Sequence, residues 1–240
     1  MMNAIELVCR YSFITNKLRY CGPHDSYLTF LEYIKKPSKE LGKEIITHLK
    51  RFEGLYPYLE LIAKKLDLKP FDYKVIEAYW IGNDLLDEFD ESDLKEMIIE
   101  LTKRGLPKSY AEKLALNIPK GMTPHHSFNV IYVGVGKVTG SVEYNIENIN
   151  NCMIRSAEVI EVKEKTVVIK EKPYVFKENT LVLGKEIKKE IDYLPEFTSL
   201  EKGNKVSIHW DFVVDKLEKK ELENLKKYNE KNIQALNSSL

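Results

Sequence analysis

The sequence predicts an α+β protein, in which an α-helical N-terminal domain is followed by a small, OB-like β-barrel and a C-terminal helix. Apolar residues recur at helical spacing through residues 1–122, whereas the region after residue 152 alternates with period two in short runs separated by turns. Helical spacing returns at 217–237. We therefore expect a helical domain at 1–122, a connecting segment at 123–151, and the barrel with its helix at 152–240.

Seven helices are expected in the N-terminal region. Asp72 is a candidate N-cap, and Gly105 stands where a C′ glycine would end a helix. Gly54 and Pro57 indicate a break or kink between two of the segments. The expected helices cover 4–13, 25–36, 38–52, 54–68, 72–89, 91–105 and 109–118.

The residue composition changes at 119–142, where prolines and glycines surround an apolar, β-branched run. This segment is expected to join the domains and is itself a candidate strand, and the polar run 145–151 is expected to be a loop before Cys152. Short strands close to one another in sequence favour a small barrel over a parallel sheet. The expected strands cover 153–162, 165–171, 174–184, 185–194 and 205–214.

Composition excludes several classes of protein. The 240 residues carry 37 basic and 37 acidic side chains, so the formal net charge is +0 and general binding to nucleic acid is not expected. No signal peptide and no window of about 20 apolar residues is found, which predicts a cytoplasmic protein without membrane attachment. The three cysteines lack a zinc-type CxxC pair and are expected to be free thiols.

Two C-terminal segments carry a resemblance. CMIRSAEVIEVKEKTVVIK begins at Cys152, and EKGNKVSIHWDFVVDKLEKKELENL contains His209. Their order resembles the HypC/HupF-type hydrogenase maturation chaperones, with a cysteine, two strands, a glycine turn, a strand with a histidine, and a Leu- and Glu-rich helix. The resemblance implies that Cys152 and His209 hold an iron centre for a nickel–iron hydrogenase. Unlike that family's cysteine, Cys152 is internal.

The N-terminal region carries a second resemblance. Its segments LRYCGPHDSY, FEGLYPYLELIA, VIEAYWIGNDLLD and HHSF are similar to an uncharacterised family found beside nickel–iron hydrogenase genes. The resemblance implies the same biological context and no particular activity.

The residue types suit iron chemistry, because a thiolate is a soft donor and imidazole a borderline one. Alternation along 205–214 places Ser207, His209 and Asp211 on the face opposite Trp210, so His209 is expected to point away from the core. The alternatives are a surface histidine bonded to Asp211 or solvent, and a Cys152 that is only a small buried hydrophobe. A reactive Cys152 would need a lowered pKa, for which His209 is the available partner.

The remaining candidate metal-binding or catalytic residues could also have purely structural roles. Cys21 and His24 could share a metal or form only a turn. Of His125 and His126, one could line a pocket, since neighbours on a strand point to opposite sides. Glu77 could do acid–base work with Asp84, although solvated faces are commoner.

The main hypothesis is a non-enzymatic accessory protein for hydrogenase maturation, which carries iron through Cys152 and His209. Its partner would be a hydrogenase large-subunit precursor or a maturation protein. One alternative is an enzyme with a small-molecule pocket in the helical domain, lined by Cys21, His24, Glu77 and His125 or His126. The other is a metal-free interaction module.

Overall fold

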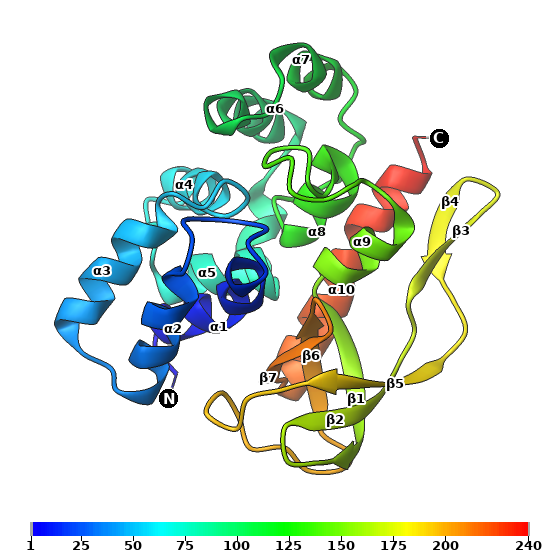
Figure 1. Ribbon diagram of the computed structural model, residues 1–240. Helices are drawn as coiled ribbons and strands as arrows, with labels where there is room; N and C mark the ends of the chain where they lie inside the picture. The colour runs from blue at the N-terminus through cyan, green and yellow to red at the C-terminus, as the bar shows by residue number, and fades with distance from the viewer. Residues whose placement is uncertain (1, 240) are drawn as a thin grey trace.

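The computed structural model describes residues 2–239 and has an α+β fold. The helices of the N-terminal half lie on one side and the strands of the C-terminal half on the other, as Figure 1 shows. This arrangement confirms the predicted order of helices and strands.

The predicted N-terminal helices are present. The two predicted caps are present: the Asp72 side chain accepts from the Lys74 amide at 3.0 Å, and Gly105 has a φ of 116°. The segment predicted as one helix at 72–89 is divided, because the α-helix ends at Trp80. The elements are α1 (Ala4–Lys17), α2 (Ser26–Lys35), α3 (Lys39–Leu49), α4 (Tyr56–Lys65), α5 (Tyr73–Trp80), η1 (Asp84–Glu88), α6 (Glu91–Glu100), η2 (Leu101–Arg104) and α7 (Lys108–Leu116).

The connecting segment is helical, so the candidate strand there and the loop at 145–151 were wrong predictions. It forms α8 (His126–Phe128), the π-helical η3 (Asn129–Gly134) and α9 (Ile146–Cys152). The Asn145 side chain caps α9 by accepting from the Asn148 amide at 2.9 Å. The apolar run misled the prediction because a short apolar stretch is compatible with a buried strand or a buried helix.

Five strands form a mixed sheet that closes on itself in the order β1-β2-β5-β7-β6. The pair β5–β7 is parallel and joins through Asp192 and Phe212, whereas the other neighbours are antiparallel. A separate hairpin, β3–β4, projects from the body (Figure 1). The strands are β1 (Arg155–Val162), β2 (Thr166–Glu171), β3 (Tyr174–Lys177), β4 (Thr180–Leu183), β5 (Ile187–Asp192), β6 (Lys205–His209) and β7 (Phe212–Lys216).

The predicted strand at 205–214 is instead a tight hairpin. Trp210 and Asp211 form its two-residue turn with φ of 50° and 52°, and His209 pairs with Phe212 across it. The sequence lacks the Asn-Gly or Asp-Gly signal that usually marks such a turn. The expected alternation therefore ends at His209, and Asp211 does not share its face.

Strand β6 is covered on both faces, which corrects the expected exposure of His209. Val206 and Ile208 point into the closed sheet, and Ser207 and His209 point toward α1. The Tyr11 hydroxyl of α1 donates to Ser207 Oγ at 2.9 Å. His209 is consequently only 1% exposed.

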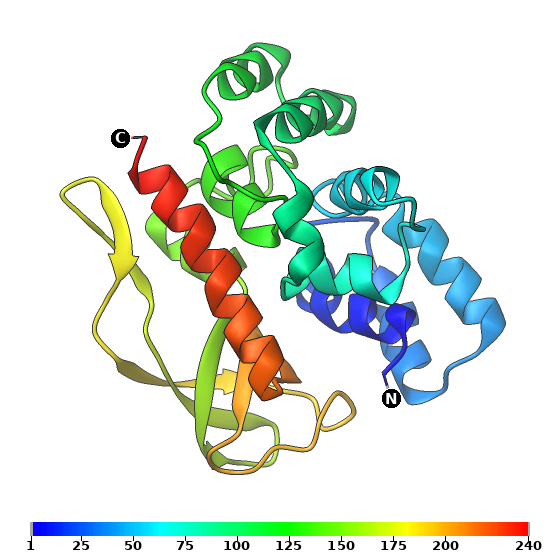
Figure 2. The ribbon, with the colours of Figure 1, turned by 180° about the vertical axis from the view of Figure 1, so that it is seen from behind.

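One hydrophobic core extends across the two regions. It contains Tyr11 and Trp80 from the helices together with Phe212 of β7 and Tyr228 of α10 (Lys219–Asn237). Figure 2 shows α10 running along the back of both the sheet and the helical region. The predicted domain limit at residues 122 and 123 therefore passes through a shared core.

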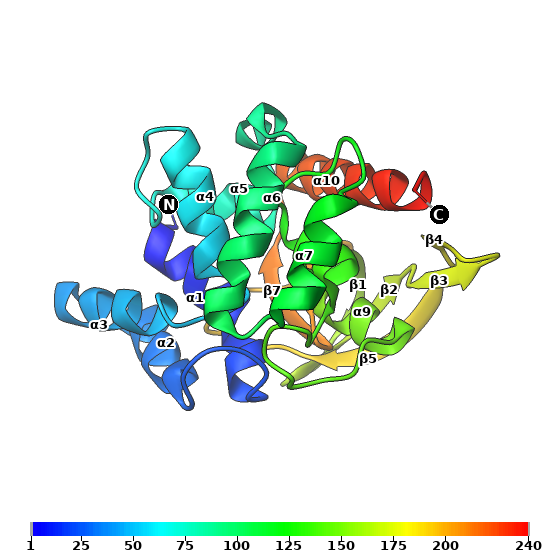
Figure 3. The same cartoon turned by 90° about the horizontal axis from the view of Figure 1, so that it is seen from above.

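The α6–α7 pair forms the part of the helical region that lies furthest from α2 and α3. Figure 3 shows these two helices side by side, as seen from above. Within residues 2–239, no helix combines the length and apolarity that a membrane crossing requires.

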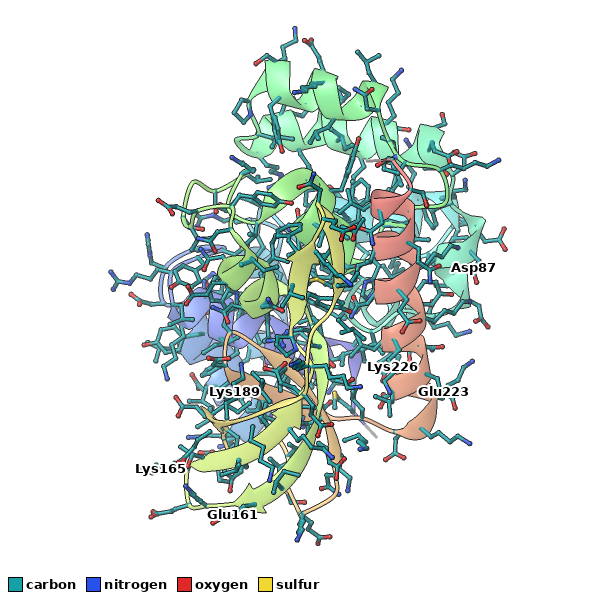
Figure 4. The ribbon with its side chains drawn as sticks, turned by 90° about the vertical axis from the view of Figure 1, so that its right-hand side faces the viewer. Asp87, Glu161, Lys165, Lys189, Glu223 and Lys226 are labelled. Atoms are coloured by element: carbon teal, nitrogen blue, oxygen red, sulfur yellow. The ribbon has the colours of Figure 1, made fainter. Side chains whose placement is uncertain are left out.

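Asp87 of η1 ties the helical region to α10, beside which it lies in Figure 4. Its carboxylate accepts from Lys227 Nζ and Lys231 Nζ, both at 2.8 Å, and from the Tyr228 hydroxyl at 3.0 Å. Partial burial alone would raise the pKa of Asp87, but these bonds outweigh it and lower the pKa to about 2.

Asp87→Asn is expected to lower the free energy of unfolding by about 1 kcal/mol at pH 7. This value allows for solvent screening of the ion pairs, because the Asp87 side chain is 39% exposed. The folded pKa lies below the unfolded value of 3.8, so the stabilisation is full above pH 4 and is lost as pH falls toward 2. Urea unfolding of the wild type and of Asp87→Asn at pH 7, 4 and 3 measures the difference between their free energies of unfolding. A difference that stayed constant from pH 7 to pH 3 would contradict it.

Candidate metal centre

Three side chains from separate parts of the chain meet where the helical region adjoins the sheet. His126 begins α8, Cys152 ends α9 and His209 ends β6. One donor atom from each lies within 4.8 Å of the other two, and Cys152 Sγ is 3.9 Å from His126 Nε2. Thus the two residues predicted as ligands, Cys152 and His209, are brought together, and His126 joins them.

The His209 ring is oriented by the backbone of α1. Its Nδ1 lies 3.2 Å from the Tyr11 carbonyl oxygen, which can only accept, so Nδ1 carries the proton. Within residues 2–239, the buried Nε2 has no hydrogen-bond partner. The lone pair of Nε2 is therefore available at the cluster, as it is in a metal-binding histidine.

The His126 ring takes part in a chain of contacts that lacks one proton. Tyr79 donates its hydroxyl to the Gly54 carbonyl oxygen and lies 2.9 Å from His126 Nδ1, while His126 Nε2 lies 2.9 Å from the Cys152 carbonyl oxygen. These three contacts need three protons, but a tyrosine and a neutral imidazole supply two. His126 Nε2 can bind a cation beside the Cys152 sulfur only in the tautomer in which Nδ1–H donates to Tyr79 and Nε2 carries no proton. A cation held there would take the place of the missing proton.

Both imidazoles are neutral near pH 7. Burial lowers the pKa of His126 to about 4 and holds the pKa of His209 well below its usual value. A neutral imidazole is the form that binds metals.

Cys152 is half-buried beside the indole of Trp210. Burial raises the pKa of its thiol to about 12, although the Trp210 side chain partly opposes this rise. His209, the available partner for lowering this pKa, is a neutral ring and does not lower it. Without a metal the sulfur stays protonated, and a bound metal would displace that proton.

The backbone around Cys152 is held from both sides. The Trp210 amide donates to the Asn151 carbonyl oxygen at 2.7 Å, and Arg155 Nε donates to that of Asn150 at 2.9 Å. Arg155 is itself paired with the buried carboxylate of Glu171. The end of α9 is thereby joined to the β6–β7 turn, which keeps the sulfur next to His209.

A small cavity of about 60 Å³ opens beside the cluster. Its walls include the cluster, Cys21, Trp80, Trp210 and the loop 134–142. A water occupies about 30 Å³ of liquid, so this space suits one or two small molecules or ligand atoms.

Cys21 lines the same cavity as the cluster, whereas His24, Glu77, Asp211 and His125 lie apart from it. His24 is exposed, Glu77 accepts from Asn83 Nδ2 at 2.7 Å, and Asp211 is exposed and paired with Lys189. His125 is fully buried, and its Nδ1 lies 2.9 Å from Ser127 Oγ. The two neighbouring histidines contact different groups, although they lie at the start of α8 and not on the strand on which the prediction rested.

The groups that orient the cluster were not found from the sequence. Tyr79 and Tyr11 orient the two rings, and the Trp80 ring packs against them at a tilt, with centroid distances of 4.6 Å to His126 and 5.9 Å to His209. Their spacing is that of ordinary helix core. No local signal separates them from other buried aromatic residues.

A larger cavity, of about 720 Å³, lies between α4 and α6. Its lining contains Glu60, Lys64, Glu96 and Arg104, and none of the residues expected to form an enzyme pocket. This larger cavity is therefore not the substrate pocket that was expected around the histidines and cysteines of the helical region.

The fold and the cluster define an α+β protein with a histidine–cysteine site between its helices and its closed sheet. The sequence profile of a family of unknown function, DUF6390, matches residues 2–240, so the chain belongs to that family. No curated protein and no solved structure matches the chain.

Proposed function

We propose that the protein is an accessory protein that binds one metal ion through His126, Cys152 and His209. The observation that carries this proposal is the convergence of one donor atom from each of two imidazoles and one sulfur within 4.8 Å of one another. Bonds of about 2.0–2.3 Å around a tetrahedral metal separate its donors by about 3.5 Å. The donors are therefore close to the spacing that one ion requires.

The ligand types narrow the choice of metal. One thiolate and two imidazoles suit zinc, iron or copper better than magnesium or calcium, which prefer oxygen. Three protein ligands leave a coordination position open, and here that position would face the cavity of about 60 Å³.

Iron delivery to a nickel–iron hydrogenase is the physiological role that we propose for this site. Support comes from the sequence resemblance to the HypC/HupF-type chaperones, in which Cys152 and His209 match the implied ligands. The partner would be a hydrogenase large-subunit precursor or a maturation protein, in the cytoplasm. The closed sheet has the strand order β1-β2-β5-β7-β6, in which β5 and β7 are parallel neighbours. This order supports an OB-like barrel.

The size of the cavity favours a carrier over an enzyme. Pockets for small-molecule substrates usually occupy about 300–1,000 Å³, far more than the space beside the cluster. A metal-free interaction module would leave the convergence of the three donors without a role.

Metal analysis of protein purified without oxygen tests the proposal. We expect about one equivalent of a thiophilic metal per chain, and one equivalent of Co²⁺ or Fe²⁺ after removal and reloading. A second measurement asks whether the iron-loaded protein captures a hydrogenase large-subunit precursor and the metal-free protein does not. A chain that holds no metal would refute the site, while metal without capture would refute only the hydrogenase role.

A further inference from the structure

Cys21 is a second thiol in the cavity beside the cluster. It lies in the turn between α1 and α2, which the buried Asn16 side chain holds in place. Asn16 Nδ2 donates to the carbonyl oxygens of Cys21 at 3.0 Å and Pro23 at 2.7 Å, and its Oδ1 accepts from the Tyr27 amide at 2.8 Å. The backbone that carries Cys21 is therefore well anchored.

The Cys21 sulfur is close to the groups that orient His126. Its thiol lies 3.6 Å from Glu53 Oε2, and a Cβ atom on Gly54 would lie 3.9 Å from Sγ. Gly54 in turn accepts the hydrogen bond of Tyr79, which contacts His126 Nδ1. Two residues, Gly54 and Tyr79, thus lie between this thiol and the His126 ring.

A second observation at the same cavity points to a ligand. His209 is 1% exposed, lines this cavity with Cys21, and has an Nε2 without a hydrogen-bond partner among the described residues. A buried polar atom without a partner is costly unless something binds it. The cavity therefore combines an unsatisfied nitrogen donor with two thiols.

We propose that Cys21 becomes the fourth ligand of the metal held by His126, Cys152 and His209, which closes the site with two sulfurs and two nitrogens. This inference rests on the proposed function. A change of the Cys21 χ1 rotamer displaces Sγ by about 3 Å, which moves the thiol without unfolding the turn. The metal–sulfur bond replaces a metal–water bond, and the thiol proton passes to the Glu53 carboxylate, which already contacts the thiol.

The consequence is a site with two states. With Cys21 bound, four protein ligands retain the metal, as in closed structural sites. With Cys21 turned back to Glu53, the open position can take a ligand from the partner protein. Retention and release would then depend on one side chain at the cavity wall.

Cobalt substitution tests the inference, because each thiolate ligand adds a charge-transfer absorption in the near ultraviolet. We expect Cys21→Ser and Cys21→Ala to bind Co²⁺ with about half of the wild-type absorption. We also expect them to lose it to a chelator about 10- to 100-fold faster. Cys9→Ala is the matched control, since Cys9 is a fully buried core residue and its variant should match the wild type.

The outcomes distinguish the two proposals. If both Cys21 variants bind Co²⁺ with wild-type absorption and release rate, Cys21 is not a ligand and the three-donor site stands. If the wild-type protein binds no Co²⁺, the proposed function fails and the inference falls with it. Far-ultraviolet circular dichroism of each variant shows that the comparison is made between folded proteins.

Discussion

Cys152→Ser and His209→Gln are each expected to lower the affinity for Co²⁺ or Zn²⁺ by at least about 100-fold. Each change removes one of three donors that converge within 4.8 Å, and even the loss of an orienting group typically costs about 10- to 100-fold. His126→Gln should have a similar effect, because Nε2 of His126 lies 3.9 Å from the sulfur. Competition with a chromophoric chelator measures the affinity of each variant.

Two matched controls separate loss of a ligand from a general effect of the substitution. His48→Gln removes an imidazole from α3 that is paired with Glu44, and Cys9→Ala removes a thiol from the core. Both should bind metal like the wild type. Wild-type affinity in Cys152→Ser, or an equal loss in the controls, would contradict the assignment of the site.

Asn232→Ala is expected to lower the free energy of unfolding by about 3 kcal/mol. The fully buried Asn232 amide accepts from the Thr123 amide at 2.8 Å and from the Thr123 hydroxyl at 3.2 Å. It donates to the Thr123 carbonyl oxygen at 3.1 Å and to Ser127 Oγ at 2.9 Å. Truncation leaves these buried groups without partners, at about 1–3 kcal/mol for each group that stays unsatisfied. Urea unfolding at pH 7 measures the loss.

Asn232 also supports the candidate metal centre, since Thr123 and Ser127 stand on either side of His126 in the chain. We therefore expect weaker metal binding in Asn232→Ala in addition to the loss of stability. Gln234→Ala, on the exposed face of the same helix, should change stability by less than about 0.5 kcal/mol. A loss of stability below about 1 kcal/mol in Asn232→Ala would show that water replaces the amide. The hydrogen bonds of Asn232 to Thr123 and Ser127 would then not be needed to stabilise the fold.

Local patterns in the sequence predicted most of the secondary structure. Periodicity identified the helices of the first 116 residues and the strands from Arg155 onward, because each pattern reflects one buried face. It failed between residues 123 and 151, where an apolar run is buried on all sides and carries no period. It also failed at 174–184 and 205–214, each expected to be one strand, because Glu178 and Asn179 and likewise Trp210 and Asp211 form hairpin turns without the usual glycine.

The candidate site was only partly predictable. The resemblance singled out Cys152 and His209, and the structure places them together. His126 was one of several further candidates, with no sequence signal to separate it from His125. The two differ because Ser127 contacts the His125 ring, whereas the Tyr79 hydroxyl and the Cys152 carbonyl oxygen contact that of His126.

By itself, the sequence determined the class of fold and the order of helices and strands outside the connecting segment, since these follow from short-range spacing, and the resemblance supplied two of the three candidate donors. Only the tertiary structure decided that α1 covers the outer face of β6 and buries His209. Only the tertiary structure added His126 and placed Cys21 at the same cavity. These features depend on contacts between residues far apart in the chain, such as the hydrogen bond between Tyr11 and Ser207, which no local pattern encodes.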